Sequence, residues 1–255
     1  MNLPLAGRGI LVTRPIEQTD ALAKEIRDAG GEAIIFPAME IVPINDDAQA
    51  SRLAQLHAYD AAIFISPNAA RHGLAAVVAQ REWPGHVRVY ALGPGTAREL
   101  KQQGLSNVIQ PDGQDTEALL ALPSLHAVNN QRIVIFRGMG GRELLAETLR
   151  ARGALVEYAE CYRRVRPECD AGPIIERWSS GHIDAVTINS AETLHNLIHM
   201  LGEANSNYLR ATPVFAPHEK IAQSARASGI EQVIATGAGD AGLLDGLITW
   251  FQTHA

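Results

Sequence analysis

A glycine-rich turn near the middle of the chain combines residue types that can bind an anion. The segment IVIFRGMGGRE spans residues 133–143 and contains Arg137, Gly138, Gly140 and Gly141. An apolar run leads into this turn, and the turn leads into a stretch with helical spacing. The first N–H groups of a helix lack intrahelical acceptors and carry the positive end of its dipole. The turn therefore predicts a site for phosphate or another anionic group.

Turns of the same kind recur along the chain, each after an apolar run. Local dipoles and arginines can bind a polyanion even where the whole chain is acidic. The candidate turns are Thr13–Pro15, Ser66–Asn68, Gly93–Thr96, Arg137–Gly140 and Asn189–Ala191.

A nucleotide cofactor and a metal are both weakly indicated. The dinucleotide fingerprint G-x-G-x-x-G fails because Glu143 stands where the third glycine should be, and no Walker A motif is present. The nine histidines show no ligand spacing. His195 and His199 are four residues apart but lack a third ligand, so we expect a helix surface there.

Composition limits the class of protein. The chain has 255 residues, of which 46% are hydrophobic, and a formal net charge of −6. This fits one large or two modest domains and disfavours a nucleic-acid partner. The two cysteines, Cys161 and Cys169, predict reduced thiols in the cytoplasm, and we expect no signal peptide and no membrane span.

Short apolar runs alternate with helical stretches. Near-continuous apolarity is typical of parallel strands that are buried on both faces. Helices are expected at 17–29 and 141–152, each followed by a stop glycine, Gly30 or Gly153. The pattern predicts an α/β fold with parallel sheets. The expected strands are 9–14, 33–37, 61–66, 87–93, 133–138, 154–159, 185–190 and 212–217.

Three segments of the first half recur in order in the second half, at a nearly constant offset. Arg14 corresponds to Arg137, Ser66 to Ser190, and Asp115 to Asp240. One such match could arise by chance, but three in register indicate two homologous halves. Two similar α/β halves usually face each other across a cleft lined by strand-to-helix turns.

The chain resembles the uroporphyrinogen-III synthase family. The matching segments are GILVTRP, FISPNA, ALGPGTA, RGMGGRELLAETLRARGALVEYAECYRRVRP and AVTINSAET, in family order over about residues 7–245. The resemblance implies two flavodoxin-like domains joined by a two-stranded linker, with a cleft between them. The first domain would comprise residues 1–37 plus 168–255 and the second residues 45–159, with linkers at 38–44 and 160–167.

The resemblance also implies the activity. The family cyclises hydroxymethylbilane, a linear tetrapyrrole polyanion, with loss of water and inversion of ring D, and it needs no cofactor or metal. Such a lyase of heme biosynthesis would be cytoplasmic and monomeric, and it could contact hydroxymethylbilane synthase transiently. Two other classes remain open: a two-domain binding protein for small anions and an α/β nucleotide-binding enzyme.

Site residues follow from the matching motifs. Tyr162 matches the family's tyrosine and would be the proton donor, although it could simply pack. Ser66, Thr96 and Ser190 could only cap helices, and the arginines could form surface ion pairs. His218 takes the place of Gly93 in the second half, where the backbone turn could be retained. The expected substrate-binding residues are Arg14, Ser66, Asn68, Gly93, Thr96, Arg137, Gly138 and Ser190.

Overall fold

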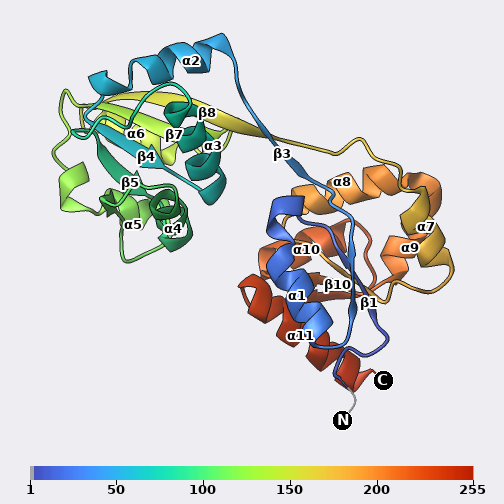
Figure 1. Ribbon diagram of the computed structural model, residues 1–255. Coiled ribbons are helices and arrows are strands. Elements are labelled where there is room, and N and C mark those ends of the chain that lie inside the picture. Colours follow the sequence, from blue (N-terminus) through green and yellow to red (C-terminus); the bar gives the residue numbers. More distant parts are fainter. Residues whose placement is uncertain (1–2, 255) are drawn as a thin grey trace. The chain divides into compact units, whose positions relative to one another are not determined.

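The computed structural model describes residues 3–254, and the chain divides into two compact units (Figure 1). Unit 1 contains the residues up to Glu40 and those from Val165 onward, and unit 2 contains Ile41–Arg164. Each unit has a mainly parallel sheet with helices on its faces, which confirms the α/β class.

Unit 1 is built on a five-stranded sheet with the order β11-β10-β9-β1-β2. All of its strand pairs are parallel. Numbered along the chain of this unit, the order is 5-4-3-1-2, which is the flavodoxin-like arrangement. The strands are β1 (Gly9–Val12), β2 (Glu32–Ile35), β9 (Ala185–Thr187), β10 (Val214–Ala216) and β11 (Val233–Ala235).

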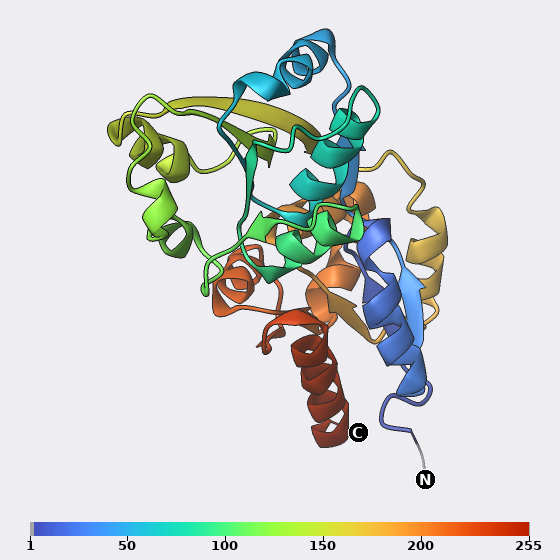
Figure 2. The same ribbon diagram turned by 60° about the vertical axis from the view of Figure 1, so that its left-hand side comes forward.

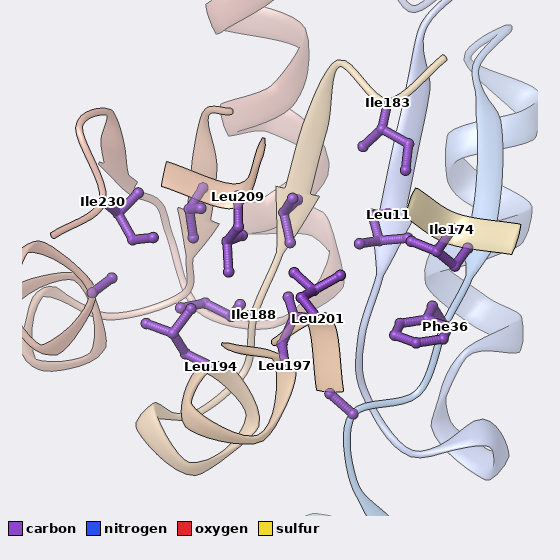
Figure 3. Packing of buried hydrophobic residues seen from close by; sticks show 14 of the residues in the cluster. Leu11, Phe36, Ile174, Ile183, Ile188, Leu194, Leu197, Leu201, Leu209 and Ile230 are labelled. Atoms are coloured by element: carbon purple, nitrogen blue, oxygen red, sulfur yellow. The ribbon is translucent and has the colours of Figure 1, made fainter. Parts of the chain in front are cut away.

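Helices cover both faces of this sheet because successive strand residues point to opposite sides. Ile10 and Val12 pack with α1 (Asp20–Asp28) and α11 (Gly239–Thr253), which lie side by side (Figure 2). Leu11 points the other way, into the cluster in Figure 3. That cluster takes side chains from α7 (Gly172–Ser179), α8 (Ala191–Leu201), α9 (Ser206–Ala211) and α10 (Glu219–Ala227).

Unit 2 has a six-stranded sheet with the order β3-β8-β7-β4-β5-β6. Residues of α5 (Thr116–Leu120) and α6 (Leu144–Ala151) pack with Ile63 and Ile135 on one face. On the other face α3 (Pro67–Val78) contacts β7 and α4 (Pro94–Gln102), and α2 (Asp47–Ala54) contacts α3. The strands are β3 (Glu40–Pro43), β4 (Ala61–Phe64), β5 (Arg88–Ala91), β6 (Val108–Ile109), β7 (Arg132–Gly138) and β8 (Leu155–Val165).

The internal repeat corresponds to equivalent places in the two sheets. Without β3, the order β8-β7-β4-β5-β6 matches β2-β1-β9-β10-β11 strand for strand. Ser66 and Ser190 follow equivalent strands with nearly the same dihedral angles, φ −159° and ψ 161° against φ −160° and ψ 160°. The two halves therefore share one architecture, although the chain passes through it in a different order.

Several predicted elements differ from the observed ones at their ends. The first helix begins at Asp20, after a short 3-10 turn that follows Pro15. The helix predicted at 141–152 begins at Leu144, because Gly140 and Gly141 have φ angles of 71° and 118° that a helix does not contain. The remaining 3-10 turns are Leu56–Ala58, Pro123–Leu125 and Glu203–Asn205.

Two strands were not predicted, β6 and β11, and β3 was expected only as part of the two-stranded linker that the family resemblance implies. β3 and β8 are neighbours in the six-stranded sheet, and they run through the segments 38–44 and 160–167. The linker and domain bounds given by the family resemblance stay a prediction. Within residues 3–254, no helix has both the length and the apolar composition that a bilayer span requires.

Candidate functional site

The expected site residues lie at the carboxyl ends of parallel strands. In unit 1, β1 and β9 are neighbours whose following helices cover opposite faces, and β7 and β4 have the same relationship in unit 2. Ligands of open α/β sheets bind outside such switch points. Arg14 follows β1 and Ser190 follows β9, while Arg137 and Gly138 end β7 and Ser66 follows β4.

Ser66 and Tyr162 meet in unit 2. Their hydroxyl oxygens are 3.2 Å apart, and either can donate. Ser66 Oγ also accepts from the backbone N–H of Ala69 at 3.0 Å, so it caps α3 as well. The Tyr162 side chain lies against Gly138, since a Cβ there would be 2.7 Å from its Cζ. Tyr162 is only 3% exposed.

Arg137 is a buried guanidinium with one unused nitrogen. It is 2% exposed and stacks over the Tyr158 ring, with Cζ 4.4 Å from the ring centroid. Nε donates to the carbonyl of Gly140 at 3.1 Å, and Nη1 donates to Glu143 Oε1 at 2.9 Å. Nη2 is buried without a hydrogen-bond partner.

Glu143 is the carboxylate that holds Arg137. Its other oxygen accepts a hydrogen bond from the Tyr158 hydroxyl. This bond and the one from Arg137 lower the pKa of Glu143, so the group is a carboxylate at neutral pH. Burial raises the pKa of Tyr158, and the bond to Glu143 adds to that effect.

Arg14, the counterpart of Arg137 in unit 1, has a different partner. Its Nη1 donates to Asp240 Oδ1 at 2.6 Å, in an ion pair whose side chains are 12% and 27% exposed. Arg14 thus forms an ion pair, as the alternative to substrate binding supposed, but this pair is largely buried and not on the surface.

The hydroxyl groups of Ser190 and Thr96 form hydrogen bonds with nearby backbone groups. Ser190 Oγ accepts from the backbone N–H of Thr193 at 3.0 Å and caps α8. Thr96 is 1% exposed and donates to the carbonyl of Leu92 at 3.0 Å. These bonds neither require nor exclude a ligand, so the assignment of both residues to substrate binding stays a prediction.

Gly93 and His218 do not share a backbone conformation. Gly93 precedes α4 with φ 82°, where glycine is favoured, whereas His218 precedes α10 with φ −152°. The expectation that this turn is retained in the second half is wrong, because a histidine side chain disfavours the positive φ. Asn68 lies in the first turn of α3 and is half-buried.

Sequence reasoning missed Glu143 and Tyr158. Glu143 was noticed only as the residue that breaks a glycine fingerprint, and Tyr158 as one member of an apolar run. Their spacing in sequence carries no signal, because the sheet brings them together. Among residues 3–254, no group of three or more histidine, cysteine, aspartate or glutamate side chains could hold a metal ion.

Comparison with known proteins gives matches over nearly the whole chain. A family model described as Uroporphyrinogen-III synthase HemD matches residues 20–245. The chain is 34% identical over 247 residues to the uroporphyrinogen-III synthase of Salmonella typhimurium (strain LT2), covering 93% of this chain and 99% of that protein. It is 32% identical over 243 residues to that of Escherichia coli (strain K12), with the same coverage.

Solved structures show the same fold. A mutant uroporphyrinogen III synthase from Thermus thermophilus has a TM-score of 0.61 at 19% identity, covering 96% of this chain and 99% of that one. The enzyme from Helicobacter pylori 26695 has a TM-score of 0.59 at 14% identity, covering 97% and 100%.

Proposed function

Since this chain belongs to the uroporphyrinogen-III synthase family, cyclising lyases of heme biosynthesis, we propose that it closes hydroxymethylbilane to uroporphyrinogen III with inversion of ring D. The observation that carries this proposal is the match along almost the full length of both chains. The failed glycine fingerprints count against the nucleotide-binding alternative.

The hydroxyl pair in unit 2 gives the reaction a hydrogen-bond donor. The substrate must lose its terminal hydroxyl to become an electrophilic azafulvene before the ring can close. Tyr162 gives its phenol proton to the departing hydroxyl, which leaves as water, and the phenolate takes back the proton that the pyrrole nitrogen loses as the azafulvene forms. Ser66 orients the phenol through the 3.2 Å contact. Most of the remaining work is positioning, because free hydroxymethylbilane closes without inversion to the type I isomer.

Substrate carboxylates need cationic and N–H donors. Arg137 supplies the guanidinium in unit 2, and the turns at Gly93, Gly138 and Asn68 supply backbone donors. Arg14 and Ser190 supply the corresponding groups in unit 1. Charge-assisted bonds of this kind are the strong ones in a carboxylate site. Thr96 supports its turn from within α4.

Further properties complete the proposal. The protein acts as a cytoplasmic monomer without metal or cofactor, and its contact with hydroxymethylbilane synthase is transient. Sedimentation of the purified chain, with and without that enzyme, measures both states. A stable dimer or a stable complex would contradict them.

The deciding experiment supplies enzymatically generated hydroxymethylbilane and separates the product isomers. The type III isomer should dominate, and the yield should be unchanged after treatment with a chelator. Persistence of the type I isomer with folded protein would refute the proposed activity. Binding of the polyanion without any change in isomer ratio would favour the binding-protein alternative.

A further inference from the structure

A cavity of about 270 Å³ lies within unit 2, at the carboxyl ends of β4, β5 and β7. Apolar side chains form part of its wall: Ile65 directly follows β4, Leu92 directly follows β5, and Leu145 lies in α6. Gln114, Thr116 and Arg142 add an amide, a hydroxyl and a second guanidinium. An apolar cavity with a few converging polar groups is the usual form of a small-molecule site.

Arg137 also lines this cavity, and it is the group there with unsatisfied bonding capacity. Within residues 3–254, the buried side-chain atoms without a hydrogen-bond partner are Arg137 Nη2 and Glu25 Oε2. A buried donor without an acceptor is costly, and each such case needs an explanation. A guanidinium presents its donors as a planar fork that matches a carboxylate, so one incoming carboxylate could satisfy the fork.

Glu143 already accepts a hydrogen bond from one of the two terminal nitrogens, but its own side chain is 47% exposed. Its carboxylate can therefore turn toward water when another carboxylate takes its place at Arg137. It is attached to the turn that covers Nη2, since a Cβ on Gly141 would lie 2.8 Å from that nitrogen. Displacement of Glu143 and a shift of this glycine turn would open Arg137 to a ligand.

Comparison of the two repeats shows why Arg137 is available. In unit 1, Arg14 is bound by Asp240. The residue that corresponds to Asp240 in unit 2 is Asp115, which lines the same cavity but caps α5 by accepting from the N–H of Ala118 at 2.8 Å. Arg137 therefore depends on an exposed glutamate, whereas its counterpart has a largely buried one-to-one partner.

We propose that this cavity receives one carboxylate-bearing side chain of the substrate, whose carboxylate binds Arg137 in exchange for Glu143. The inference rests on the proposed function for the identity of the ligand. Between turnovers the Glu143 carboxylate occupies the place of the substrate carboxylate and accepts the hydrogen bond from Arg137. Arg142 and Thr116 then stand beside the incoming carboxylate, and the apolar wall accepts its methylene groups.

The test uses the full chain and a fragment of the substrate chemistry, pyrrole-3-propionate, with its primary amide as the uncharged control. Backbone amide resonances of Gln114–Thr116 and Gly140–Leu145 should shift with the carboxylate and not with the amide. Carboxylate binding that leaves these resonances unchanged would overturn the assignment to this cavity. Failure of the carboxylate to bind even at concentrations far above those at which the substrate saturates the enzyme would overturn it too.

Variants separate the exchange from a general charge effect. Glu143→Gln should bind the carboxylate about two- to fivefold more tightly, because the variant lacks the half-exposed carboxylate that competes for Arg137. Glu147→Gln removes the same charge from the first turn of the helix that follows Glu143, and this variant should bind as the unmodified chain does. Equal affinities for the two variants would refute the exchange.

Arg137→Lys retains the charge but removes the fork, and it should weaken carboxylate binding about tenfold or more. A thermal melt checks that this variant folds. If it does not fold, the comparison of Glu143→Gln with Glu147→Gln decides whether the carboxylate exchanges with Glu143. The proposed function is tested separately by the isomer that the unmodified chain forms. Type III product with no carboxylate binding in the cavity refutes this inference alone, and carboxylate binding without type III product refutes the proposed function alone.

Discussion

Ser66 Oγ and Tyr162 Oη lie 3.2 Å apart, although the two residues are on different elements of unit 2. Tyr162→Phe retains the ring and its packing and removes the hydroxyl. We expect the turnover number to fall by about 10- to 100-fold, the low end for a proton donor, because azafulvene formation is intrinsically easy. More substrate should then escape to the type I isomer. Quenched-flow assays with isomer analysis measure both, and full activity would make Tyr162 a packing residue.

Ser66→Ala separates capping from catalysis. It should lower the free energy of unfolding by about 1 kcal/mol, because the cap of α3 is lost. Ser190→Ala removes the equivalent cap of α8 and should lower stability by a similar amount. Ser66→Ala should lower the turnover number less in the Tyr162→Phe background than in the unmodified chain, because both changes break the same contact. Ser190→Ala should show no such dependence on Tyr162. Additive effects on the turnover number would show that Ser66 does not act through Tyr162.

Gly138→Ala should displace Tyr162 without changing any polar group. A Cβ at this position would be 2.7 Å from Tyr162 Cζ and 3.0 Å from its hydroxyl. We expect a loss of about 1–3 kcal/mol in unfolding free energy, as for other overpacked sites, together with a lower turnover number. Gly85→Ala is the matched control, since a Cβ there meets open space. Unchanged activity of the Gly138 variant would mean that the phenol position is not critical.

The two cysteines should differ sharply in reactivity. Cys161 is 1% exposed, and burial raises the pKa of its thiol to about 12, so almost no thiolate forms at neutral pH. Cys169 is exposed. A colorimetric disulfide reagent should label Cys169 in the folded chain and both cysteines after denaturation. Rapid labelling of a folded Cys169→Ser variant would contradict the burial of Cys161.

Alkaline pH should destabilise unit 2 through Tyr59. Burial, followed by a hydrogen bond to Glu157, raises the pKa of Tyr59 from 10.0 to about 12. The stabilisation is therefore fully present below pH 10 and is lost as the pH rises toward 12, because the unfolded chain releases the proton first. Urea midpoints at pH 9 and pH 11 should differ more for the unmodified chain than for Tyr59→Phe. Parallel curves for the two proteins would exclude this contribution.

Much of the fold could be predicted from the sequence, because its signals are local. Continuous apolar runs marked strands such as β1 and β4, and the repeat marked which strands correspond. β6 and β11 were missed because each is two or three residues long and only partly buried. The long β8 was cut short because the apolar run ends at Ala159, where Glu160 follows, and because Arg163 and Arg164 near its end are exposed and charged.

The site was harder to predict, because its contacts join residues distant in sequence. The motif resemblance supplied Ser66 and Tyr162 separately, but only the sheet order brings their hydroxyls together. The repeat predicts that Arg14 and Arg137 have equivalent partners, so it could not show that one binds Asp240 and the other Glu143. They depend on whether the corresponding aspartate faces the arginine, as Asp240 does, or caps a helix, as Asp115 does.

The pairing of β1 with β9 has a consequence for folding during synthesis. Ile10 lies opposite Ala185, so β1 can pair early with β2 but must wait for its other partner, β9, which is made long after it. All strands of unit 2 lie between Glu40 and Val165, and they can pair before that partner leaves the ribosome. Closing the longer loop costs more entropy and is slower. Amide protection measured on stalled chains should therefore reach β4 and β7 before β1, and simultaneous protection would show that the two units form together.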